Sequence, residues 1–160
     1  MFIIYRILSF FINIIGLFMA IALVIIVPIF ITAPVLWLPL FLIIAVVLYT
    51  FFSYRFSRKV LIRKEMVDHS LRDWIRVNGF VTLFFTFLNI PAIINLIRNP
   101  QSYFEATKEF SKQFGQGTQQ TLSPGNVTAM MTVMLIYLVA LFIHVFWTFT
   151  LLKKHKEYLQ

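Results

Sequence analysis

The chain has 160 residues, of which 60% are hydrophobic and 12% are charged, and its mean hydropathy is +0.86. Soluble domains carry charge on about a quarter of their residues, so this composition excludes an ordinary soluble domain and indicates a membrane protein. The chain contains no cysteine, which excludes thiol redox chemistry, thiolate catalysis and cysteine-ligated zinc or iron–sulfur centres. Its 14 Lys and Arg residues against 6 Asp and Glu residues give a net charge of +8. In so apolar a chain this excess is expected to set the membrane topology rather than to bind nucleic acid.

Four stretches of the chain are long and apolar enough to cross a hydrocarbon core of about 30 Å at a helical rise of about 1.5 Å per residue. We predict these spans at residues 7–27, 35–53, 78–97 and 130–152. The fold class that follows is an all-α membrane protein, in which residues 1–160 form a single multi-pass domain built on a bundle of four transmembrane helices.

The first span has two features that affect its interpretation. Arg6, an apolar run, and then Ala20 and Ala22 imitate a cleavable signal peptide, but the run stays apolar beyond the alanines, so we expect this helix to be retained. Pro28 and Pro34 then bracket a short apolar segment. Because a proline lacks an N–H and restricts the residue before it, we predict that the first helix ends here and that a tight turn leads to the second span.

The connection between the third and fourth spans, residues 98–128, is predicted to face outward and to carry an amphipathic helix on the membrane surface at residues 102–114. Ser102 and Glu105 have the capping-box spacing that begins a helix. One side of this predicted helix carries Tyr103, Thr107, Phe110 and Phe114, and charged side chains fall elsewhere.

The connection between the second and third spans, residues 55–77, is strongly basic. Its cations and one tryptophan are candidates for contact with anionic lipid head groups or with a partner protein. These residues are Arg55, Arg58, Lys59, Arg63, Lys64, Arg72, Trp74 and Arg76. Positive loops stay in the cytoplasm, and placing both termini inside puts eleven of the 14 Lys and Arg residues on the cytoplasmic side. We therefore predict a protein of the cell inner membrane with both termini and this basic loop in the cytoplasm.

The positions of the carboxylates in the sequence argue against catalysis. All six lie outside the four predicted spans, whereas proton-coupled transport and intramembrane proteolysis usually place acidic groups within the membrane. The chain also contains neither a His-Glu-x-x-His motif nor a phosphate-binding Gly-x-x-x-x-Gly-Lys-Ser/Thr loop. We therefore expect no catalytic residues, no cofactor and no metal site.

Polar and small side chains within the spans repeat at helical spacing and are expected to face the inside of the bundle. Counted from the predicted cytoplasmic ends, one layer about 9 to 12 Å deep consists of Asn13, Thr86 and His144. A second, shallower layer consists of Tyr49, Thr82 and Thr148. Gly16 and Ala20 are four residues apart and should let another helix approach closely. Asn89 and Pro91 mark an expected kink in the third span.

Two interpretations of the deeper layer remain open. In the first, the side chains form hydrogen bonds that hold the helices together. In the second, they line a polar path that opens toward the cytoplasm, with His144 as its only titratable member.

The preferred function is association: a small integral membrane protein that acts as an accessory or scaffold subunit of a membrane complex. The alternative is a small oligomeric channel or transporter built around the polar layer of His144. Expected partners are anionic lipid head groups, further copies of the chain or other membrane subunits, and no nucleic acid. The frequent Phe, Ile, Asn and Lys residues suit an AT-rich bacterial genome.

Overall fold

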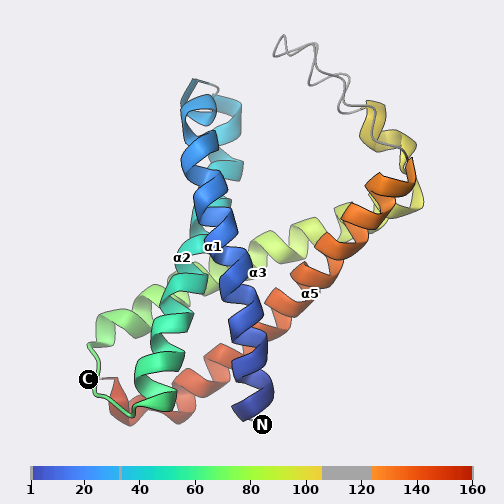
Figure 1. Cartoon of the computed structure of the whole chain (residues 1–160). Coiled ribbons are helices and arrows are strands. Elements are labelled where there is room, and N and C mark those ends of the chain that lie inside the picture. Colours follow the sequence, from blue (N-terminus) through green and yellow to red (C-terminus); the bar gives the residue numbers. More distant parts are fainter. Residues whose placement is uncertain (1, 33, 106–123, 160) are drawn as a thin grey trace. The chain divides into compact units, whose positions relative to one another are not determined.

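The structure is a computed structural model of the chain, and it describes residues 2–32, 34–105 and 124–159. Nearly all of these residues are helical (Figure 1). The elements with assigned bounds are α1 (Phe2–Thr32), the short helix η1 (Pro34–Leu36), α2 (Trp37–Phe56), the π-helix η2 (Ser57–Ile62), α3 (His69–Arg98), α5 (Pro124–Lys154) and η3 (Lys156–Tyr158).

Four helical segments of the described chain are long and apolar enough to cross a membrane. They are Ile3–Pro28, Pro34–Ile62, His69–Arg98 and Gly125–Lys154. Each contains one of the predicted spans completely, so the prediction of a helical protein with four helices long and apolar enough to cross a membrane is confirmed.

Helix α1 does not end where the prolines predicted. Pro28 lies inside α1, and the helix continues to Thr32 before η1 begins at Pro34. A proline removes one backbone N–H, and membrane helices tolerate this loss where neighbouring groups satisfy the freed carbonyl. The predicted turn therefore starts later than Pro28, and Pro34 begins the short helix that leads into α2.

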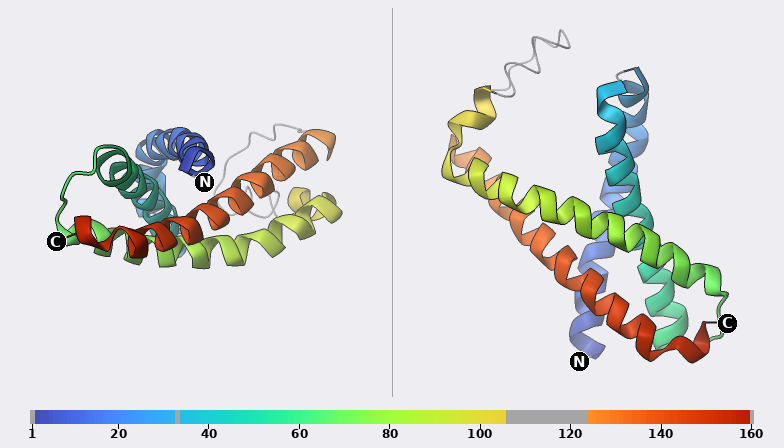
Figure 2. Two further views of the ribbon diagram at one scale, coloured as in Figure 1. Left: turned by 90° about the horizontal axis from the view of Figure 1, so that it is seen from below. Right: turned by 180° about the vertical axis from the view of Figure 1, so that it is seen from behind.

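The described chain divides into two compact units, Met1–Thr86 with Ala140–Gln160, and Phe87–Val139. In the first unit, α1 and α2 run side by side in both views of the ribbon (Figures 1 and 2). Its apolar core includes Ile12, Val46, Ile75, Leu141 and Val145, each almost fully buried. Buried polar side chains accompany this core, and they form the candidate site described below.

Two glycines let helices of the first unit approach closely. A Cβ atom added to Gly16 of α1 would lie 2.8 Å from the Cβ of Thr50 in α2. A Cβ added to Gly79 of α3 would lie 2.7 Å from the ring of Phe149 in α5. Both distances are shorter than van der Waals contact, so a larger residue at Gly16 requires Thr50 to move, and one at Gly79 requires the Phe149 ring to move. Gly16 thus makes the kind of close contact that its spacing with Ala20 predicted.

Most of the basic connection 55–77 is helical. Arg55 lies in the last turn of α2, the π-helix follows, and a turn through Lys64, at a φ of 53°, leads toward α3. The Asp68 carboxylate accepts a hydrogen bond of 3.0 Å from the Ser70 backbone N–H at the start of α3. This hydrogen bond holds the pKa of the Asp68 carboxyl below its usual range. The cap of α3 is therefore Asp68.

The C-terminal segment is held against the same connection. The Val67 backbone N–H donates a hydrogen bond of 2.9 Å to the Tyr158 carbonyl, and Val67 forms a parallel β-bridge with Leu159. Leu159 is buried. The chain end after α5 is thus anchored to the turn that joins α2 to α3.

The second unit contains the later part of α3 and the earlier part of α5. Its buried apolar residues are Ile93, Val127, Met131 and Leu138. Asn89 and Pro91, the predicted kink, lie within α3, which continues unbroken to Arg98. Residues 101–105 are helical, and the remainder of the predicted surface helix 102–114 lies outside the described residues.

Candidate functional site: a buried polar cluster beside an open groove

His144 is the centre of a hydrogen-bonded cluster in the first unit. Its Nε2 lies 2.8 Å from the Ser9 hydroxyl of α1, and its Nδ1 lies 2.8 Å from the Tyr49 hydroxyl of α2. Thr148, one turn further along α5, lies 3.0 Å from the hydroxyls of both Tyr49 and Tyr5. These five side chains, which we call the His144 cluster, join α1, α2 and α5.

The direction of each hydrogen bond follows from counting protons. Thr148 donates to the backbone carbonyl of His144 and therefore accepts from Tyr49 and from Tyr5. Tyr49 has one hydroxyl proton and gives it to Thr148, so the Nδ1–H of His144 donates to the Tyr49 oxygen. The Nε2 of a neutral imidazole is then an acceptor, and Ser9 donates to it. With a neutral His144, this assignment uses every proton once.

The side chains that form these hydrogen bonds are almost completely buried. Tyr5, Tyr49, His144 and Thr148 are each 0% exposed, and Ser9 is 3% exposed. Tyr5 also stacks on the imidazole, with ring centroids 5.0 Å apart and planes inclined by 6°. Within the described residues, no buried side-chain nitrogen or oxygen lacks a hydrogen-bond partner. The cluster is therefore closed, because its donors and acceptors are used within the chain.

Of the six residues in the two predicted layers, only His144, Tyr49 and Thr148 belong to this cluster. Asn13 donates to the Ser9 carbonyl, and Thr86 donates to the Leu83 carbonyl, so both satisfy backbone groups of their own helices. From the second layer, Tyr49 and Thr148 bond to each other, as their shared depth predicted. Thr82 is buried and donates to the carbonyl of Asn78 in its own helix.

Ser9 and Tyr5 are the members of the cluster that the layers omitted. Ser9 precedes Asn13 by one helical turn and shares its face, so the periodicity of α1 already contained it. The helix begins at Phe2, well before the predicted span at residue 7, and this places Tyr5 inside the first turns of α1. An error of one turn in depth, about 5.4 Å, exchanged Asn13 for Ser9.

The predicted head-group residues lie at the end of the first unit where α2 meets α3. Several of their side chains already have partners: Arg63 pairs with Glu65 at 3.3 Å, Arg72 pairs with Asp73 at 3.2 Å, and Trp74 stacks on Phe52. Exposed ion pairs of this kind contribute little to stability, about 1 kcal/mol or less. The others are Arg55, Arg58, Lys59, Lys64 and Arg76, and of these only Lys59 is partly covered.

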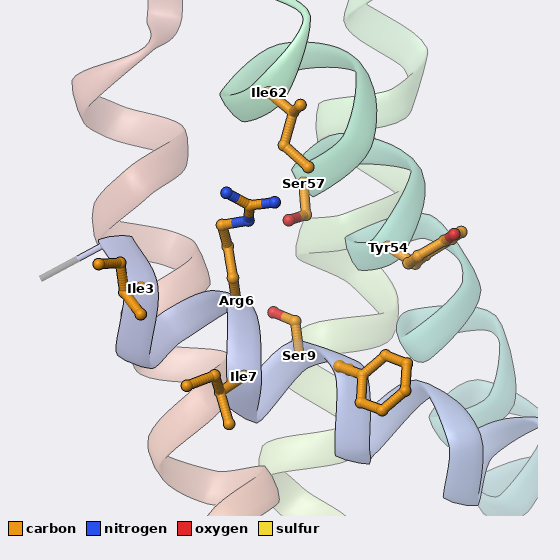
Figure 3. A pocket seen from close by; sticks show the side chains of 8 residues that line it. Ile3, Arg6, Ile7, Ser9, Tyr54, Ser57 and Ile62 are labelled. Atoms are coloured by element: carbon orange, nitrogen blue, oxygen red, sulfur yellow. The ribbon is translucent and has the colours of Figure 1, made fainter.

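A groove runs between α1 and α2 beside the cluster. Its first part is a pocket of about 400 Å³ (Figure 3). Its walls are Ile3, Arg6, Ile7, Ser9, Phe10, Tyr54, Ser57 and Ile62. A second pocket of about 410 Å³ continues along the same two helices and shares Phe10 and Tyr54 with the first. Ser9 therefore belongs both to the cluster and to the wall of the groove.

No cluster of three or more metal-ligating side chains occurs among the residues that the structure describes. Comparison of the chain with protein-family models, curated proteins and solved structures finds no match. The role of the cluster and of the groove follows from their own chemistry.

Proposed function

We propose that this protein acts by association, as a small accessory or scaffold subunit of a complex in the bacterial inner membrane. The observation that carries the proposal is an aromatic stripe on α3. Phe80, Phe84 and Phe87 follow one another at intervals of four and three residues and are 65%, 56% and 67% exposed. This spacing places them on one face of the helix, and aromatic side chains are enriched where protein surfaces meet.

The closed His144 cluster supports the same proposal. A conduction path needs polar groups that exchange partners with water or with an ion, whereas these hydroxyls and the imidazole bond to each other. The cluster therefore stabilises the packing of α1, α2 and α5. It supplies neither a binding site for a transported ion nor a group for catalysis.

Truncating two phenylalanine side chains of the stripe tests the proposal. We expect Phe84→Ala with Phe87→Ala to reduce, by about tenfold or more, the recovery of a discrete complex after mild detergent extraction, because interface aromatics carry much of the binding energy. The measurement is the mass and composition of the complex that co-purifies with a tagged chain.

The control is Phe11→Ala with Phe18→Ala on α1. These phenylalanines are 59% and 67% exposed, so they match the stripe in residue type and exposure. Equal recovery from both double variants would contradict an association through α3. Ion or proton flux through liposomes that disappears in His144→Asn would favour the oligomeric channel instead.

The proposed orientation places both termini and the connection 55–77 in the cytoplasm, as the distribution of Lys and Arg favours. A single cysteine introduced at Val67 should react with an impermeant maleimide only after the cells are opened, and the chain has no native cysteine to interfere. Position 67 lies in the turn held by the C-terminal segment, so one label reports on both parts. Labelling of position 67 in intact cells would contradict this orientation and would place the connection 55–77 outside.

A further inference from the structure

We propose that the groove between α1 and α2 binds one anionic phospholipid, with the head-group phosphate on Arg6 and Ser57 and an acyl chain along the second pocket. The proposal is independent of the association through α3. It rests on the charge at one end of the groove, on a serine hydroxyl that faces the pocket, and on the length and lining of the rest.

Arg6 supplies the charge. Its guanidinium reaches from α1 toward Ser57, at the start of η2 (Figure 3). Among the described residues Arg6 has no ion pair, although Arg63 and Arg72 of the same unit are paired with carboxylates. In the described part of the chain, no carboxylate lines the pocket. A guanidinium binds phosphate oxygens through two parallel hydrogen bonds, so this site matches an anion and has no internal counter-ion.

Ser57 supplies a second donor. The residue is 5% exposed, and its hydroxyl, which forms no hydrogen bond within the described chain, is not among the fully buried polar atoms, while its backbone N–H caps the end of α2. Ser57 lines the pocket, and its hydroxyl points toward the side of Arg6 (Figure 3). The neighbouring Ser9 has already given its proton to His144 and can only accept. Ser57 is therefore the hydroxyl that can donate to a phosphate oxygen.

The apolar part of the groove fits an acyl chain. Ile3, Ile7 and Ile62 surround Arg6, and the second pocket is lined by Leu17 and Ala20 among other residues. From Phe10, which both pockets share, to Ala20 the helix rises about 15 Å, which is half of a hydrocarbon core of about 30 Å. The groove therefore has the depth of one leaflet, with the cation at its end.

A diffusing anion explains these features less well. A free phosphate would use Arg6 and Ser57 but would leave the apolar continuation of the groove empty. A helix from a second copy would cover the apolar part but would bury the Arg6 charge without a partner, which is costly. Only an amphiphilic anion satisfies both ends of the groove.

Native mass spectrometry of the full-length protein tests the proposal. The protein is reconstituted with equal amounts of phosphatidylglycerol and phosphatidylcholine, extracted in mild detergent, and its retained lipids are counted. We expect one phosphatidylglycerol per chain, and we expect Arg6→Gln to reduce its retention by about tenfold, the effect of losing one charge-assisted contact. Arg58→Gln, which removes an exposed arginine outside the pocket, is the matched control and should change retention by less than about twofold.

Two further variants test the two ends of the groove separately. Ser57→Ala should weaken retention of phosphatidylglycerol while leaving the apolar part intact, and Ala20→Phe should weaken it by filling the acyl path. Both leave the Arg6 charge in place, so they remain informative if Arg6→Gln does not fold. Equal losses in Arg6→Gln and Arg58→Gln would overturn the site in favour of diffuse surface charge. Displacement of the lipid by millimolar inorganic phosphate, or a lipid-free dimer, would overturn it in favour of a free anion or of a second copy.

Discussion

Replacing His144 with leucine should lower the free energy of unfolding by about 1 to 3 kcal/mol, the cost of leaving buried polar groups without a partner. The imidazole accepts from Ser9 and donates to Tyr49, and both hydroxyls belong to residues that are almost completely buried. Leucine occupies a similar volume but offers neither a donor nor an acceptor. The measurement is equilibrium unfolding in mixed micelles with increasing SDS, followed by tryptophan fluorescence.

His144→Asn is the conservative variant for this position. Its amide carries both a donor and an acceptor, so we expect a change of no more than about 1 to 2 kcal/mol. Phe146→Leu, on an exposed position of the same helix, controls for the effect of any substitution in α5 and should be close to neutral. A His144→Leu protein as stable as the native chain would show that the cluster contributes nothing to packing.

Replacing Gly16 with leucine should have a comparable effect through a different mechanism. The position already faces the side chain of Thr50, and a Cβ alone would approach the Thr50 Cβ to 2.8 Å. Thr50 is β-branched, so its side chain is stiff, and its hydroxyl is held by the Val47 carbonyl at 2.8 Å. The helices must therefore separate, which for overpacking costs about 1 to 3 kcal/mol.

The control for Gly16→Leu is the same substitution at a glycine whose added side chain would face open space. No described residue lies within 4 Å of a Cβ added to Gly125, near the start of α5, so Gly125→Leu should be close to neutral. The same unfolding titration compares the two variants. If Gly16→Leu and Gly125→Leu unfold at the same SDS fraction, the close approach of α1 and α2 at Gly16 does not exist in the membrane.

Much of the architecture could be predicted from the sequence because the spans are long and uninterrupted. The hydrophobic runs determine where helices cross the membrane, and the four long apolar helices contain the predicted spans. The ends of the helices were harder to predict. Pro28 was expected to stop α1, but a single missing N–H does not end a membrane helix.

The residue at the centre of the candidate site, His144, could be predicted from the sequence, but not all of its hydrogen-bond partners could. Tyr49 and Thr148 were predicted at one depth and His144 in the next, deeper layer, because each faces inward, and the structure joins the three by hydrogen bonds. Counting from a predicted helix end carries an error of a turn, and it ignores the tilt of each helix. Because of that error, Asn13 was predicted as the α1 residue beside His144, whereas the structure shows Ser9 there. The groove could not be predicted at all, because its walls depend on side chains of α1, α2 and η2 that meet only in the folded protein.

The central claim is that the side chains of the His144 cluster bond to one another and hold α1, α2 and α5 together. A double-mutant cycle with Tyr49→Phe and His144→Leu measures this most directly, and Tyr49→Phe combined with Asn13→Leu is the reference cycle. The cluster predicts a coupling free energy of about 0.6 to 1.7 kcal/mol for the first pair, the range measured for hydrogen bonds between membrane helices, and none for the second. Additive effects for Tyr49 and His144 would contradict the claim.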